Sequence, residues 1–133
     1  MTPESAEHLS KAREKVGDAG KILSALLPNI AAHLAYIAAF QAAQAYVFER
    51  TGMVAKTHNG VQSEFGRLAQ EDGRIGTELM VFLRRAYDYK RNDDYAVGAA
   101  FRRVSQEEAE GAVRQAARFV DTIAATLSSS HPK

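Results

Sequence analysis

The sequence contains no cysteine, which excludes structural disulfides, thiolate zinc sites, iron–sulfur ligation and a cysteine nucleophile. It also lacks any apolar run that approaches the roughly 18 residues needed to span a membrane. Its N-terminus has no basic segment followed by an apolar one, which is the pattern of a secretion signal. We therefore expect a cytoplasmic protein without a membrane segment.

Charge of one sign is not in excess either, because 17 basic and 16 acidic residues leave a formal net charge of +1. Such a balanced chain has no general attraction for nucleic acid, so any role of that kind depends on local charge. The 133 residues, 46% of them hydrophobic and 25% charged, have the composition of one globular domain. We expect residues 1–133 to form that single domain, with a core over about 5–127 and a frayed tail at 128–133.

Apolar residues do recur at intervals of three and four along nearly the whole chain, which is the spacing of a helix face. This spacing predicts a helix from Pro3, capped by Thr2, to about Leu26. Further helices are predicted over about 30–50, 57–71, 77–91 and 106–127, with a turn at residues 92–94. Because no segment alternates with period two, the predicted fold class is all-α, an antiparallel up-and-down bundle of about five helices.

The second of these helices is rich in alanine and should be the central one. Small side chains allow neighbouring helices to approach closely. Its alanines are Ala31, Ala32, Ala35, Ala38, Ala39, Ala42, Ala43 and Ala45. The last helix has the clearest start, because the residues from Ser105 to Glu108 fit a capping box.

No motif for a metal or a cofactor is evident. The four histidines, His8, His33, His58 and His131, are far apart and form no i, i+4 pair of the kind found in helical zinc sites. Glycine-rich phosphate loops are also absent, and we assign Glu107 and Glu108 to the first turn of a helix. The sequence therefore predicts neither a metal site nor a cofactor.

Positive charge is concentrated between Arg84 and Arg103. This segment contains six basic and three acidic residues, which gives it a local charge of +3. The basic residues are Arg84, Arg85, Lys90, Arg91, Arg102 and Arg103, and the aromatic residues Tyr87, Tyr89, Tyr95 and Phe101 lie among them. Aromatic rings beside cations can hold unpaired bases and neutralise phosphates. Alternatively, these cations stabilise a helix end and the tyrosines cover the edge of the core.

Three segments resemble the HEPN family, named for higher eukaryotes and prokaryotes nucleotide-binding domains. They are the aromatic and alanine pattern of residues 36–45, the run from Lys56 to Val61 that leads into Phe65-Gly66, and Asp94-Tyr95 after a basic residue. Together with the capped last helix, they cover about residues 5–127 in the expected order. The chain is most similar to the small stand-alone prokaryotic members of the family.

This resemblance implies a helical bundle that is commonly a homodimer and is often encoded beside a minimal nucleotidyltransferase in toxin–antitoxin-like systems. Many relatives are RNA-cleaving toxins that use an arginine followed, after four to six residues, by a histidine. That motif is absent here, so no catalytic residue is predicted. The sequence also departs from its closer relatives in having Gln41 where they often have histidine and Lys90 where they often have arginine.

The residues predicted to bind a nucleotide or RNA are Lys90, Arg91, Asp94 and Tyr95, with His58, Arg84 and Arg85 as secondary candidates. The predicted function is a catalytically degenerate HEPN-like module that binds a nucleotide, RNA or a nucleotidyltransferase partner. One alternative is an RNase toxin with an altered site. Another is a purely structural protein that dimerises through its alanine-rich helix. In the structural alternative, Arg91 and Asp94 form a plain surface ion pair and His58 is bonded locally at the start of a helix.

Overall fold

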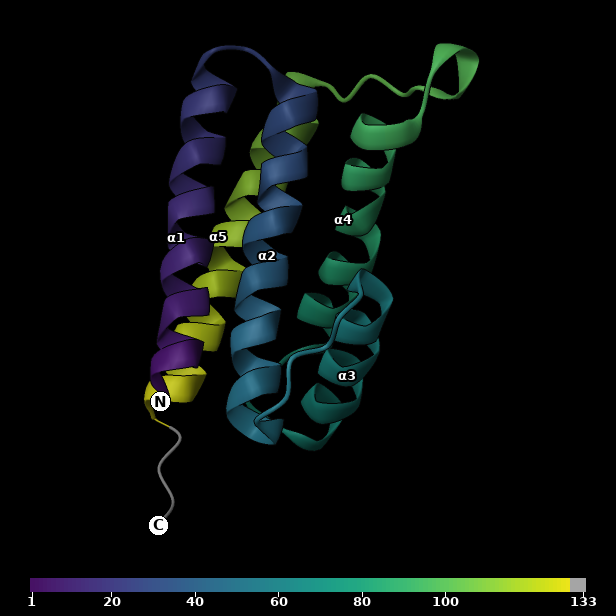
Figure 1. The fold of residues 1–133 in the computed structure, drawn as a ribbon. Helices are drawn as coiled ribbons and strands as arrows, with labels where there is room; N and C mark the ends of the chain where they lie inside the picture. The colour runs from purple at the N-terminus through teal and green to yellow at the C-terminus, as the bar shows by residue number, and fades with distance from the viewer. Residues whose placement is uncertain (130–133) are drawn as a thin grey trace.

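The computed structural model describes residues 1–129, and all the regular structure in that range is helical. The elements are α1 (Pro3–Ser24), α2 (Pro28–Thr51), α3 (His58–Glu71), α4 (Thr77–Tyr95), the short 3-10 helix η1 (Gly98–Ala100) and α5 (Gln106–Ser128). They pack side by side as a bundle (Figure 1), which confirms the predicted all-α fold. None of the helices within residues 1–129 combines the length and apolarity needed to cross a bilayer. Residues 130–133 of the predicted frayed tail lie outside the described range.

The predicted helix starts are confirmed by their capping side chains. The Thr2 hydroxyl oxygen accepts a hydrogen bond from the Ser5 N–H at 3.1 Å, and the Thr57 hydroxyl accepts one from the Gly60 N–H at 2.9 Å. The Ser105 hydroxyl accepts from the Glu108 N–H at 3.0 Å. Each bond satisfies a backbone donor that has no partner inside its helix, so these starts are fixed by local chemistry.

The first helix ends earlier than predicted, at Ser24 rather than near Leu26. Leu26 has a φ of 63° and is 71% exposed. A left-handed residue cannot continue a right-handed helix, so the chain turns here toward Pro28. The prediction that the first helix extends to about Leu26 is therefore too long by two residues.

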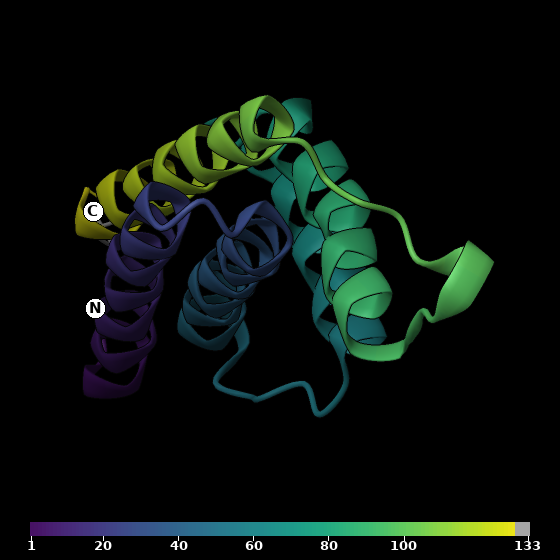
Figure 2. The same ribbon diagram turned by 90° about the horizontal axis from the view of Figure 1, so that it is seen from above.

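Helix α2 occupies the centre of the bundle, as predicted, and contacts α1, α3, α4 and α5. Seen from above, it lies between α1 and α4, with α5 across it (Figure 2). All eight alanines between residues 31 and 45 have no exposed surface. They are covered by other helices of the same chain, so in this structure the alanines themselves present no surface to a second copy.

Helix α3 runs in the same direction as α2, because residues 52–57 rise beside the bundle before α3 begins (Figure 1). At its start, the His58 ring lies 4.4 Å from that of Phe40, and further along, the Phe65 ring lies 5.5 Å from that of Tyr46. This connection departs from a strict up-and-down order. Its consequence is that His58 is placed against the middle of α2.

Helix α4 continues through residues 92–94, where the sequence predicted a turn, and ends at Tyr95. Asn92 donates a hydrogen bond to the Arg102 carbonyl at 2.8 Å, and its side-chain oxygen accepts one from the Arg102 N–H. The carboxylates of Asp93 and Asp94 are also occupied, the first by His33 and the second by Lys90. Because these side chains are occupied elsewhere, they do not compete for the helix hydrogen bonds.

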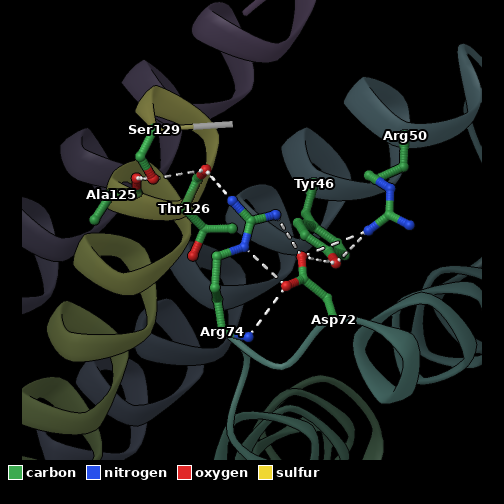
Figure 3. A network of polar contacts seen from close by, with 7 residues as sticks. All are labelled: Tyr46, Arg50, Asp72, Arg74, Ala125, Thr126 and Ser129. Carbon is green, nitrogen blue, oxygen red and sulfur yellow. Dashed lines mark hydrogen bonds and ion pairs between the residues drawn. The ribbon is translucent and has the colours of Figure 1, made fainter. Parts of the chain in front are cut away.

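A polar network around Asp72 joins the α3–α4 turn to α2 and α5, at the end of the bundle opposite the α4–α5 connection (Figure 3). The Asp72 carboxylate accepts hydrogen bonds from the Arg74 guanidinium at 2.8 and 2.9 Å and from the Tyr46 hydroxyl at 2.8 Å. Arg74 also donates to the Thr126 carbonyl near the end of α5. The α3–α4 turn is thereby fixed to both α2 and α5.

Candidate functional site

Three elements bring polar and aromatic side chains together between α2 and α4. Helix α2 contributes His33, Tyr36 and Phe40, which are spaced three and four residues apart and therefore share one face. The start of α3 contributes His58. The second half of α4 contributes Tyr87, Lys90, Asp93 and Asp94. We call this group the His58 cluster.

His58 is held by hydrogen bonding and by aromatic contacts. Its Nδ1 lies 2.8 Å from the Tyr36 hydroxyl, and its ring centroid is 4.4 Å from that of Phe40 and 5.4 Å from that of Tyr87. Burial lowers the pKa of His58, and the positive charge of Lys90 lowers it further. His58 is consequently a neutral imidazole at neutral pH.

Lys90 and Asp94 form the charged part of the cluster. The Lys90 ammonium donates a hydrogen bond to Asp94 Oδ2 at 2.7 Å, and the lysine side chain is only 17% exposed. This bond raises the pKa of Lys90 and lowers the pKa of Asp94. The Lys90 nitrogen also lies 5.4 Å from the ring centroid of Tyr95, which is 72% exposed.

His33 is a member of the site that the sequence analysis did not identify. Its Nδ1 lies 2.9 Å from Asp93 Oδ2 and 3.9 Å from Asp94 Oδ1. The spacing between histidines gives no indication of it, because the partners of His33 are carboxylates some 60 residues away in the sequence. The available signal was that His33, Tyr36 and Phe40 share one face of a helix.

A second group of candidates lies on the outer side of α4. Arg84, Arg85 and Arg91 line a hollow of about 580 Å³ together with Asn59, Gln62, Tyr87 and Asp88. Within residues 1–129, neither Arg84 nor Arg85 has a carboxylate within 4.0 Å. Arg91 also lines a neighbouring hollow of about 660 Å³ with Tyr95 and Arg102. We call this surface the α4 arginine face.

The predicted residues thus belong to two adjoining groups. His58, Lys90 and Asp94 lie in the His58 cluster, with Tyr95 beside them. Arg84, Arg85 and Arg91 form the arginine face. Tyr87 joins the two groups, because it contacts His58 on one side and lines the arginine hollow on the other.

Two predicted local interactions are not present. Arg91 does not pair with Asp94: its guanidinium lies 3.5 Å from Asp88, while Asp94 binds Lys90. Arg91 and Asp94 also have the i, i+3 spacing of helix neighbours, but Asp94 is occupied by Lys90 and faces His33. His58 is not bonded locally at its helix start either, because its partner is Tyr36 on α2.

Gln41, which the resemblance set against a family histidine, belongs to neither group. Its side-chain oxygen lies 2.8 Å from Nδ1 of His8 on α1. Gln41 therefore contributes to the contact between α1 and α2, and the two histidines of the His58 cluster are His33 and His58.

Comparison with known proteins agrees with the fold. A family model described as the HEPN domain matches residues 5–126. A UPF0332 protein of Thermotoga maritima is 27% identical over 113 residues, which cover 85% of this chain and 83% of that protein. A UPF0332 protein of Gloeobacter violaceus is 28% identical over 120 residues, which cover 90% of this chain and 93% of the relative.

Proposed function

Because this chain belongs to the HEPN domain family, we propose that it is a module that binds single-stranded RNA through the α4 arginine face. The observation that carries the proposal is the convergence of Arg84, Arg85 and Arg91 around one hollow. Guanidinium groups bind phosphate with charge-assisted hydrogen bonds, and closely spaced phosphates are the repeating feature of an RNA strand.

Aromatic side chains border the same surface. Tyr87 lines the hollow that the three arginines surround, and the largely exposed Tyr95 lines the next one along α4. Unpaired bases stack on such rings while cations neutralise the backbone. Because Arg91 lines both hollows, a strand that occupies both would contact this residue.

Fluorescence anisotropy with a labelled oligouridylate at several salt concentrations tests this proposal. We expect the logarithm of the binding constant to fall by about 0.7 for each phosphate contact when the salt concentration rises tenfold. Arg91→Ala should reduce that slope, and Tyr95→Ala should weaken binding by about 1 to 3 kcal/mol. Arg13→Ala is the matched control, because Arg13 is an exposed arginine of α1 that pairs with Asp121. An absence of salt-dependent binding, or an equal loss in the Arg13 variant, would refute the proposal.

A second candidate function, RNA cleavage at an altered site, is favoured by the state of His58. A neutral imidazole with a cation close by is the arrangement that proton abstraction and phosphate stabilisation require. Incubation of purified protein with labelled RNA tests it, with His58→Ala and His8→Ala compared. Cleavage lost only in the His58 variant would support an enzyme, whereas no cleavage, or cleavage that both variants retain, supports binding alone.

We also propose that the chain forms a homodimer, as the resemblance to its family implies. Because the α2 alanines are buried, the contact must use another surface. Exposed apolar side chains occur at the α1–α2 turn, where Leu26, Leu27 and Ile30 lie, and in the α4–α5 connection at Val97. Light scattering at micromolar concentration should give twice the 14.5 kDa of one chain. A mass of one chain would contradict the proposal.

A further inference from the structure

We propose that His33, Asp93 and Asp94 bind a divalent transition-metal cation of the Zn²⁺ or Mn²⁺ class. Each side chain offers one ligand atom, and the three atoms lie within 4.8 Å of one another. Metal–ligand bonds of about 2.0 to 2.2 Å place neighbouring ligand atoms about 3 to 3.5 Å apart. The separations of 2.9 and 3.9 Å between His33 Nδ1 and the two carboxylates are close to that spacing.

The two carboxylates leave a suitable charge for such a cation. Asp94 uses Oδ2 to accept from Lys90, and its other oxygen, Oδ1, faces His33. Asp93 has no lysine or arginine nitrogen within 4.0 Å among residues 1–129. Lys90 therefore offsets one of the two carboxylates, and these three side chains together carry a charge of −1.

The surroundings favour ordered binding over a loose surface association. The His33 side chain is 20% exposed, that of Asp93 25% and that of Asp94 34%. His33 lies on α2, at the centre of the bundle, while the two aspartates lie on α4, so the ligands are held by two packed helices. The Lys90 bond holds Oδ2 of Asp94 and leaves Oδ1 toward His33, as a supporting partner of a metal ligand does.

The donor set indicates the class of cation. One imidazole nitrogen and two carboxylate oxygens form a mixed set that suits Zn²⁺ or Mn²⁺ better than the oxygen-only preference of Ca²⁺ or Mg²⁺. Three protein ligands also leave at least one coordination position for water or another small ligand. This inference does not rest on RNA binding, because it concerns the cation alone.

Isothermal titration of the chelator-treated, untagged protein with Zn²⁺ and with Mn²⁺ tests the site. We expect saturable binding of one cation per chain, and an affinity at least about tenfold lower in His33→Ala and Asp93→Asn. His8→Ala and Asp121→Asn are matched controls, because His8 is a half-buried histidine bonded to Gln41 and Asp121 is an exposed carboxylate paired with Arg13. Both controls should bind as the unmodified chain does.

Two results would overturn the proposal: no saturable binding of either cation, or binding that His33→Ala and Asp93→Asn leave unchanged. A measurement on the unmodified chain guards against variants that fail to fold. Substoichiometric Mn²⁺ should broaden the amide NMR signals around residues 33, 93 and 94 before any others, because the ion is paramagnetic. Broadening centred on other carboxylates would equally overturn the assignment.

Discussion

At the scale of single residues, His58 shows how neighbours from other helices set the chemistry of a side chain. Tyr36 and Phe40 on α2 and Tyr87 and Lys90 on α4 surround it. Burial disfavours the charged imidazolium, and the ammonium of Lys90 disfavours it further, whereas Asp94 acts in the opposite direction. Lys90 and Asp94 are both distant from His58 in the sequence.

Replacing Lys90 by alanine should raise the pKa of His58 toward its usual value of about 6.5. The change removes a positive charge and releases the carboxylate of Asp94, and both effects favour the protonated ring. NMR titration of the His58 ring protons measures this shift. Lys11→Ala, in which an exposed lysine of α1 is removed, should leave the titration unchanged. A lower or unaltered His58 pKa in the Lys90 variant would contradict the expectation.

Asp72→Asn should reduce the free energy of unfolding by about 2 to 3 kcal/mol, because a buried carboxylate loses charge-assisted hydrogen bonds. Hydrogen bonds from Arg74 are the main reason that the pKa of Asp72 lies far below its usual range. Its stabilising contribution is therefore complete above the unfolded pKa of about 3.9 and is lost as pH falls toward the folded pKa.

Denaturant unfolding between about pH 5 and pH 2 measures both effects. The unmodified chain should lose stability over this interval, and Asp72→Asn should show a shallower dependence. Asp121→Asn is the exposed control, since its pair with Arg13 is on the surface, and it should change stability by less than about 1 kcal/mol. Equal pH dependence in the Asp72 variant and the unmodified chain would argue against this role.

At the scale of the elements, the ends of the helices depend on backbone conformation. Gly52 ends α2 with a φ of 73°, a region that residues with a side chain rarely adopt. Gly17 lies inside α1, in ordinary helical conformation. An added Cβ would meet no atom within 4 Å at either position, so the two glycines differ in backbone alone.

Gly52→Ala should therefore destabilise the protein by about 1 kcal/mol, because of the left-handed strain. Gly17→Ala should stabilise it by about 0.5 to 1 kcal/mol, because alanine loses less conformational freedom in a helix. Thermal unfolding followed by circular dichroism compares the two variants. If both variants changed the unfolding temperature in the same direction, backbone conformation would not explain the effect of alanine at these two positions.

At the scale of the whole molecule, the alanines of α2 allow four other helices to pack around it. Ala43→Leu should reduce the free energy of unfolding by about 1 to 3 kcal/mol, since added volume in a filled core forces strain. Ala6→Leu, on the exposed side of α1, is the matched control and should have little effect. Denaturant unfolding measures both, and an unchanged stability in Ala43→Leu would mean that the core can accommodate the larger side chain.

The sequence by itself determined the helices and most of their ends. Apolar spacing identified the buried faces, and Thr2 and Ser105 marked helix starts that the structure confirms. These features depend on contacts within one turn, so neighbouring residues are sufficient to specify them. The alanines likewise identified α2 as the central helix, because close packing needs small side chains.

Only the tertiary structure decided how the candidate residues are grouped. The sequence predicted a turn at residues 92–94, but contacts with His33 and Arg102 keep these residues in α4 and separate Lys90 and Asp94 from the arginines. The rise of residues 52–57 sets the direction of α3, and this places His58 beside Tyr36. Both outcomes depend on pairs of side chains far apart in the chain, and local spacing carries no information about which distant partners will satisfy one another.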